Sequence, residues 1–191
     1  KTTDPLEKVN NLFKLKKNKI YLANLTLSDF RKFRSLKVKF DKKLTVIIGS
    51  NGAGKTTIVD SISKALSWVG STIVKKNGRG KPVTEQDVNI YSRTYSEANV
   101  QIKIGENSDY IASLRKTVKG AKETKNSDLE ALEELGGLFR VINNYNITHE
   151  KLEINLPLFV SYSVNRTNIK SNKTFNIGKI SSVSVGSRFD A

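Results

Sequence analysis

Hydrophobic and polar residues alternate along four stretches of the chain, which is the pattern of strands with one buried face. The first two stretches are residues 20–30 and 34–40, joined by a turn near Asp29. Further on, residues 99–105 and 109–118 alternate on either side of a short polar turn. Two such neighbouring strands indicate a β-hairpin. The pattern therefore predicts a β-rich part made of antiparallel strands.

Two other stretches are apolar without alternation. Residues 44–49 read LTVIIG and are rich in β-branched residues. A run of this kind is typical of a central strand that is covered on both faces, as in parallel sheets. Residues 156–164, LPLFVSYSV, form a second apolar strand candidate. Together these stretches predict a mixed α/β protein.

Helical spacing begins after the first apolar run, where the apolar positions are Ile58, Val59, Ile62, Ala65, Leu66 and Val69. They recur over about four turns and predict an amphipathic helix. A second helix is predicted with Ser127 as its N-cap and Glu130 completing a capping box. Gly136 and Gly137 are expected to end that helix, since glycine is common just after a helix C-terminus.

The turn between residues 44–49 and the first helix reads GSNGAGKT, residues 49–56. It fits the G-x-x-x-x-G-K-[ST] pattern of a phosphate-binding P-loop at every fixed position. Gly52 and Gly54 allow positive φ and a close approach of the backbone to phosphate oxygens. Lys55 is expected to reach the β- and γ-phosphates as a point charge, and the Thr56 hydroxyl is placed to bind Mg²⁺.

The surroundings of this loop resemble the SMC/RecF-like ABC ATPases, a branch of the P-loop NTPases. The resemblance covers roughly residues 20–70 and includes the turn DFRKF, residues 29–33, where Asp29 stands in place of the usual Asn. Asn51 and Asp60 match the family pattern. Further along, VTEQDV, the hairpin and LPLFVSYSVNRT resemble the first lobe of PtuA-type anti-phage ATPases. Tyr162, Asn165 and Arg166 match that pattern, while Ser161 departs from it.

The resemblance implies an ABC/SMC-type head, with residues 20–191 as its N-terminal lobe. Residues 1–19 are predicted to be a basic amphipathic arm, because Leu6, Val9, Leu12 and Phe13 fall on one helical face with lysines elsewhere. The resemblance implies ATP and Mg²⁺ as cofactors, with ATP sandwiched between the heads of a homodimer or higher oligomer. It also implies a nuclease partner of the HNH kind and, as in retron systems, a reverse transcriptase with its RNA–DNA. The predicted nucleotide-binding residues are Arg31, Lys32, Asn51, Gly52, Ala53, Gly54, Lys55, Thr56 and Thr57, with Lys55 as the catalytic residue. Arg31 and Lys32 enter this set through the resemblance, near the phosphates and ribose.

Basic residues outnumber acidic ones by 33 to 18, which gives a formal net charge of +15. A field of this sign attracts polyanions. Residues 71–87 are predicted to be a loop, and its four basic side chains are a candidate contact with a nucleic-acid backbone. They are Lys75, Lys76, Arg79 and Lys81. The alternative is a solvated loop. The chain has no cysteine and no run long enough to span a bilayer, so we expect a cytoplasmic protein without membrane contact.

Parts of a complete ATPase head are missing from the sequence. No apolar strand ends in the Asp-Glu of a Walker B motif, and no LSGG-type signature occurs. His149 and the two glutamines, Gln86 and Gln101, do not stand where a switch or Q-loop residue is expected. Because hydrolysis needs a second acidic Mg²⁺ ligand and a group that orients water, we expect the chain alone to bind ATP without hydrolysing it.

The leading hypothesis is the ATP-binding lobe of an ATPase that controls a nuclease or a nucleic-acid complex in anti-phage defence. Alternatives are a DNA-repair clamp ATPase of the RecF type, a nucleotide-binding subunit of an ABC transporter, and a P-loop kinase or GTPase. A further alternative is a non-enzymatic nucleic-acid-binding lobe that keeps ATP as a structural ligand. The transporter is disfavoured by residues 41–43, DKK, in place of a Gly-Glu turn.

Overall fold

The computed structural model describes residues 19–105, 108–148 and 156–162. Four strands form one antiparallel sheet in the order β2-β1-β3-β4. Their bounds are Ile20–Phe30 for β1, Phe33–Lys39 for β2, Tyr95–Ile104 for β3 and Ser108–Thr117 for β4. These are the four alternating stretches of the sequence, so the predicted antiparallel part is confirmed. The arm predicted over residues 1–19 lies, except for its last residue, outside the described residues.

Alternation along the strands decides which face of the sheet is buried. In β3 every second residue from Ser96 to Ile104 is buried, and its neighbours are only partly covered. In β1 the buried positions include Ala23, Leu25 and Leu27. Because a strand turns successive side chains to opposite faces, one face of the sheet is apolar and the other is polar. Helices pack on the apolar face and bury it.

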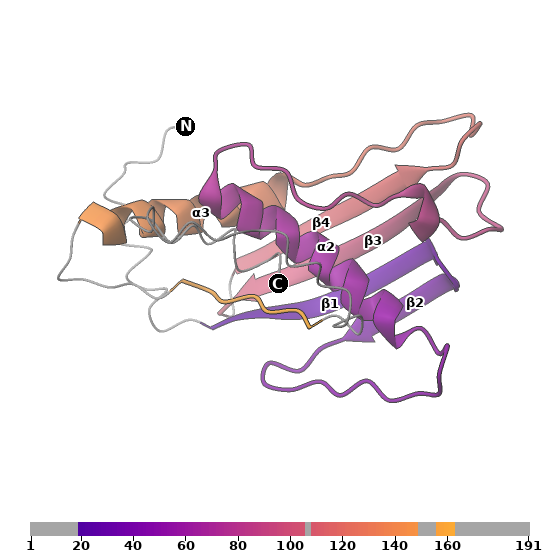
Figure 1. Cartoon of the computed structure of the whole chain (residues 1–191), viewed down its shortest axis with the longest axis horizontal. Helices are drawn as coiled ribbons and strands as arrows, with labels where there is room; N and C mark the ends of the chain where they lie inside the picture. Colours follow the sequence, from indigo (N-terminus) through magenta and orange to yellow (C-terminus); the bar gives the residue numbers. More distant parts are fainter. Residues whose placement is uncertain (1–18, 106–107, 149–155, 163–191) are drawn as a thin grey trace, which may run out of the picture.

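Two helices lie across that apolar face (Figure 1): α2, Lys55–Val74, and α3, Glu130–Thr148. A short 3₁₀ helix, η1, spans Glu85–Asp87 between α2 and β3. The strands and the two helices share one hydrophobic cluster, to which α2 contributes Val69 and Ile73 and α3 contributes Leu132 and Leu135. The helical spacing in the sequence therefore predicted α2 correctly. The helix continues to Val74, however, so the loop expected from residue 71 begins four residues later.

Gly136 does not end α3, contrary to the prediction. It lies inside the helix where α3 crosses α2, and a Cβ at this position would lie 2.7 Å from Thr72 Cβ and 2.8 Å from the Val69 carbonyl oxygen. The Arg140 guanidinium donates to the Thr72 carbonyl oxygen nearby, at 2.9 Å. Small residues allow two helices to approach closely. Gly136 therefore allows α3 to pack closely against α2 and does not end the helix.

Ser127 is likewise not the N-cap of α3, which begins at Glu130. Its hydroxyl accepts a hydrogen bond from the Arg115 backbone N–H at 2.8 Å and donates to the Arg115 carbonyl oxygen at 3.3 Å. The side chain therefore joins the approach to α3 to strand β4.

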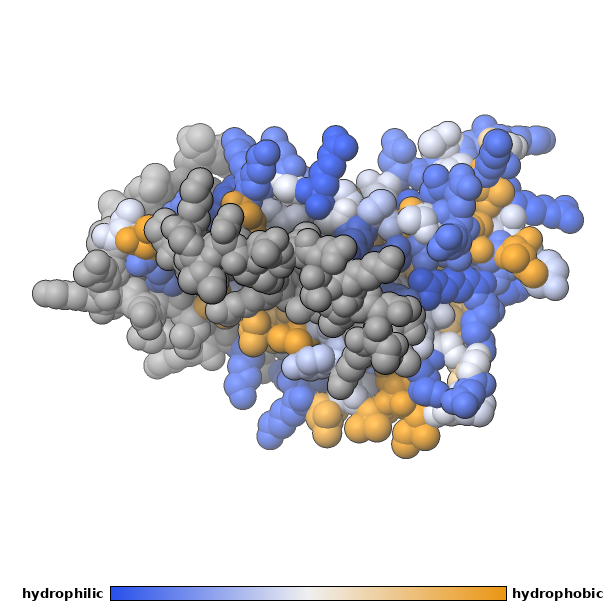
Figure 2. Space-filling view, in the orientation of Figure 1, coloured by the Kyte–Doolittle hydropathy of each residue, from blue (hydrophilic) through white to orange (hydrophobic). Residues whose placement is uncertain are grey.

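Residues 44–49 differ most from the prediction. They form no regular secondary structure and pair with no described strand, and Leu44, Val46 and Ile48 are 73%, 68% and 90% exposed. An apolar run becomes a central strand only where strands on both sides take up its N–H and C=O groups, and the described residues supply none here. Figure 2 shows apolar surface along this loop, which projects from the sheet.

The second apolar strand candidate has the same outcome over its described part. Residues 156–162 are not assigned to a strand, and Leu158 and Val160 are exposed. Phe159 packs against the core cluster. Among the described residues no helix is both long and apolar enough to cross a membrane.

The crossing of α2 and α3 gives a matched pair of glycine variants. Gly136→Ala is expected to lower the free energy of unfolding by about 1 kcal/mol, because the added methyl group meets Thr72 and backbone. Gly137→Ala is expected to raise it by roughly 0.5–1 kcal/mol, because alanine favours a helix interior and the nearest atom is the mobile end of Arg140 at 3.8 Å. Urea denaturation measures both. Equal effects would contradict the assigned crossing.

Candidate nucleotide site

The loop before α2 has the backbone shape that its glycines predict. Gly52 has φ +76° and Gly54 has φ +98°, both in the left-handed region that L-residues rarely adopt. Gly54 also has no room for a side chain, since an added Cβ would lie 2.4 Å from the Phe33 ring. At Gly52 the space is open, so the conformation alone requires glycine there.

The N-terminus of α2 opens toward this loop without a protein cap. Its N-cap is Gly54, no side chain caps the helix, and the first turn holds no acidic residue. The first N–H groups of a helix have no partner within the helix, and the helix dipole adds partial positive charge at the same end. The combination suits an anion such as phosphate.

Lys55 and Thr56 are the first residues with side chains at this end of the helix. The Lys55 ammonium group donates to the carbonyl oxygens of Gly49 at 2.7 Å and Ser50 at 2.9 Å, so it lies over the turn of the loop. Thr56 is exposed, whereas Thr57 is buried. The predicted loop residues therefore lie together at one helix end, and their contacts with nucleotide and Mg²⁺ stay predictions.

Lys32 and Arg31 reach the site from the turn between β1 and β2. The Lys32 ammonium group donates to the Gly52 carbonyl oxygen, which places it directly on the loop. Arg31 is held by two carboxylates: its guanidinium contacts Asp60 of α2 at 2.7 Å and Asp87 of η1 at 2.9–3.0 Å. Burial lowers the pKa of Arg31, but these carboxylates outweigh it and raise the pKa overall. The nucleotide contact predicted for Arg31 stays a prediction.

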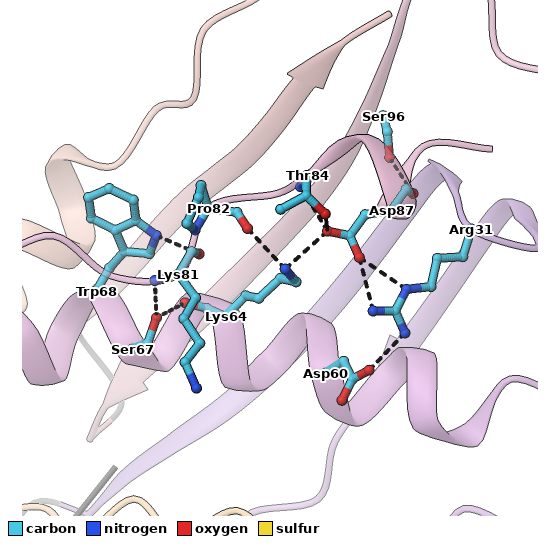
Figure 3. A network of polar contacts seen from close by, with 10 residues as sticks. All are labelled: Arg31, Asp60, Lys64, Ser67, Trp68, Lys81, Pro82, Thr84, Asp87 and Ser96. Atoms are coloured by element: carbon cyan, nitrogen blue, oxygen red, sulfur yellow. Dashed lines mark hydrogen bonds and ion pairs between the residues drawn. The ribbon is translucent and has the colours of Figure 1, made fainter. Parts of the chain in front are cut away.

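Asp87 lies at the centre of the polar network drawn in Figure 3, with its side chain 1% exposed. Besides Arg31 it contacts the Lys64 ammonium group at 3.0 Å and accepts from the Thr84 backbone N–H at 2.8 Å. Burial by itself raises the pKa of Asp87, but the bonds from Thr84 and Lys64 more than offset it and hold the pKa below the ordinary value. The carboxylate is therefore charged and fully partnered.

The basic segment, residues 75–81, is packed against the side of α2 in a fixed path. The Trp68 indole N–H donates to the Lys81 carbonyl oxygen at 3.1 Å, and the Lys81 N–H donates to Ser67 at 2.7 Å. A Cβ on Gly80 would lie 2.4 Å from the backbone nitrogen of Trp68. The four basic side chains themselves, Lys75, Lys76, Arg79 and Lys81, are exposed.

The structure does not bring the start of the basic segment to the phosphate loop. Lys75 follows the last residue of α2, and the loop precedes the first. A helix of 20 residues is about 30 Å long. The two candidate anion sites therefore lie near opposite ends of one helix.

Asp87 and its contact with Arg31 were missed by sequence reasoning. A local signal exists, because Thr84-x-x-Asp87 fits the capping-box pattern and the structure forms that box. Its charged partners, Arg31 in the β1–β2 turn and Lys64 on α2, are distant in sequence and carry no such signal. Within the described ranges no group of three or more histidine, cysteine or acidic side chains is arranged to hold a metal ion.

Comparison with known families places the chain in a defined class. The family described as AAA domain matches residues 24–184. The chain therefore belongs to this family. The match includes the P-loop, α2 and the whole antiparallel sheet except the first residues of β1.

Individual relatives of the chain include two proteins named as probable ATPases and one named as RecF. The chain is 30% identical over 151 residues to the retron Vc95 probable ATPase of Vibrio cholerae, covering 78% of this chain and 29% of that protein. It is 25% identical over 202 residues to the retron Ec83 probable ATPase of Escherichia coli, covering 98% and 35%. The DNA replication and repair protein RecF of Clostridium acetobutylicum is 26% identical over 135 residues, covering 71% and 34%.

Among solved structures, the recombination mediator protein RecF with ATP resembles the chain with a TM-score of 0.43 and 20% identity, over 63% of this chain and 31% of RecF. The chain spans about a third of the length of these curated relatives.

The charge on Asp87 predicts how stability responds to acid. Its stabilisation is present above about pH 4, the ordinary pKa of an aspartate in an unfolded chain, and is lost as the pH falls through the lower pKa of the folded state. Asp87→Asn is expected to lower stability at neutral pH and to flatten its decline below about pH 4.

The free energy of unfolding of the unaltered protein and of Asp87→Asn is measured from about pH 2.5 to about pH 7, a range that brackets the ordinary aspartate pKa. Glu85→Gln is the matched control, because Glu85 is an exposed carboxylate on the same 3₁₀ helix. An unchanged acid dependence in Asp87→Asn would contradict the assignment.

Proposed function

We propose that the protein binds ATP with Mg²⁺ at the loop before α2. The single observation that supports this most strongly is the uncapped N-terminus of α2 behind Gly52 and Gly54. Backbone N–H groups would hold the phosphates. Lys55 would supply positive charge to the β- and γ-phosphates, and Thr56 would ligate Mg²⁺. Asn51, Ala53 and Thr57 would complete the nucleotide-binding set.

We further propose that the protein is an ATPase that works as a dimer of heads around ATP. The relatives named probable ATPases support hydrolysis. The retron in their names supports a place in a retron-type assembly, with an HNH-type nuclease and a reverse transcriptase carrying RNA–DNA as partners. In such an assembly ATP binding would control the nuclease in anti-phage defence. A role in DNA repair is the second candidate, because RecF is also among the relatives.

Nucleic-acid binding by the basic segment is the third part of the proposal. Its four exposed cations carry no neighbouring aromatic platform within residues 75–81, so the contact would be with phosphates and not with bases. The packing of this segment on α2 supports a fixed surface, because the backbone that carries the cations need not be ordered when a polyanion binds.

Lys55→Ala is expected to reduce ATP affinity by at least about a hundredfold, because the variant lacks the charge that meets the β- and γ-phosphates. Isothermal titration of the intact protein with ATP and Mg²⁺ measures the change. Lys119→Ala removes an exposed lysine from the β3–β4 side of the molecule, after β4 ends, and should leave the affinity unchanged. ATP binding by Lys55→Ala at the unaltered affinity would refute the loop assignment.

Binding of duplex DNA is expected to weaken steeply with salt, with a slope of about −0.9 per phosphate neutralised on a plot of log affinity against log salt. Replacing Lys75 and Lys76 by alanine should make this slope shallower. Fluorescence anisotropy at several salt concentrations measures it. The matched control replaces Lys119 and Lys122, two exposed lysines elsewhere. Equal slopes for both double variants would rule out the basic segment as the contact.

A further inference from the structure

The turn between β1 and β2 has a backbone that an isolated peptide would avoid. Asp29 has φ +45° and Arg31 has φ +47°, although neither is glycine. Left-handed conformations are uncommon for such residues and persist where the surroundings hold them. The turn contains Phe30, which is completely buried and pairs with Phe33 across the hairpin.

The segment Asp87–Asn89 holds this turn through its backbone. The Arg31 N–H donates to the Asp87 carbonyl oxygen at 2.7 Å, and the Asn89 N–H donates to the Asp29 carbonyl oxygen at 2.8 Å. The Asn89 side-chain amide also donates to the Arg31 carbonyl oxygen. Both left-handed residues are thus fixed by hydrogen bonds to one segment that is distant in sequence. Arg31 and Asp87, for example, are 56 residues apart.

The turn held in this way is in direct contact with the phosphate loop. Lys32 donates to the Gly52 carbonyl oxygen. Its Cδ atom and the Phe33 ring occupy the space that a Cβ on Gly54 would need, at 3.1 Å and 2.4 Å. A shift of the turn would therefore move atoms that touch both left-handed glycines of the loop.

The Asp87 side chain joins the same turn to α2. Its carboxylate holds the Arg31 guanidinium, which in turn contacts Asp60 one turn and a half along the helix from Lys55. The second carboxylate oxygen holds Lys64, one helical turn beyond Asp60 (Figure 3). One buried carboxylate therefore connects the turn with the helix whose N-terminus forms the anion site.

We propose that Asp87 is a positioning residue for nucleotide binding, acting through Arg31. It fixes the turn Asp29–Lys32 against the phosphate loop and α2, so that the loop is held in its binding shape before ATP arrives. Preorganisation of this kind raises affinity because less ordering is left to the binding step. The inference rests on the proposed ATP binding at the loop.

A double-mutant cycle on the intact protein tests the proposal. Asp87→Asn and Arg31→Gln should each weaken ATP binding by about tenfold. The double variant should bind no more weakly than the weaker single variant, because both changes remove one interaction. ATP affinity is measured by isothermal titration well below the unfolding temperature of every variant, so that the affinity refers to folded protein.

A purely structural role is separated from positioning by a second ion pair. Glu97→Gln breaks the contact of Glu97 with Arg115 at 2.6 Å between β3 and β4, where neither residue touches the phosphate loop. This variant should unfold at a lower temperature and bind ATP with unchanged affinity. If Asp87→Asn fails to fold, Asp60→Asn takes its place in the cycle, because Asp60 is 42% exposed and holds the other side of Arg31.

The possible results distinguish the two proposals. No ATP binding by the unaltered protein would overturn the proposed function and this inference with it. ATP binding by the unaltered protein, with unchanged affinity in Asp87→Asn, would overturn the inference alone. Additive losses in the double variant would also overturn it, because they would mean that Arg31 and Asp87 act separately.

Discussion

The space around Gly54 is the constraint on which the rest of this structure depends. The residue combines φ +98° with a Phe33 ring where any side chain would start. It is also the N-cap of α2, so the helix begins without a side-chain acceptor. Glycine at this one position allows the loop its backbone direction and lets the β1–β2 turn pack closely against it. It also leaves the positively charged end of the helix dipole without a side-chain cap.

The body of α2 explains why that helix end can stay open. With glycine at the N-cap in place of a capping side chain, a helix gives up roughly a few tenths of a kcal/mol, and α2 is held by apolar residues packed on the sheet and on α3. Polar contacts fix its outer side: Lys64 meets Asp87, and Trp68 meets the backbone of the basic segment. Packing therefore supplies the stability, and the polar network sets the position of the loops relative to the helix.

Much of this arrangement can be predicted from the sequence, because local patterns determine it. The alternating strands, α2 and the loop at residues 49–56 follow from spacing alone. Two glycines show the limit. The motif correctly predicts the positive φ of Gly54, whereas the local sequence wrongly predicts a helix end at Gly136, because it does not show how closely α2 approaches. Asp87 was missed for the same reason, since its partner Arg31 is 56 residues away.

Residues 44–49 mark a different limit, because strand formation depends on neighbours as well as on composition. Their apolar pattern predicts a central strand, yet no strand among the described residues pairs with them. The loop that follows nevertheless has the glycine conformations of an anion site. The shape of the loop therefore depends on its glycines, the β1–β2 turn and α2 more than on pairing of the strand before it.

The most direct test of the central claim is a structure of the intact protein with a non-hydrolysable ATP analogue and Mg²⁺. We predict phosphate oxygens within hydrogen-bond distance of backbone N–H groups between Gly52 and Thr56, with the Lys55 ammonium group on the β- and γ-phosphates. A nucleotide bound away from the N-terminus of α2, with Lys55 still on the Gly49 and Ser50 carbonyl oxygens, would contradict the account.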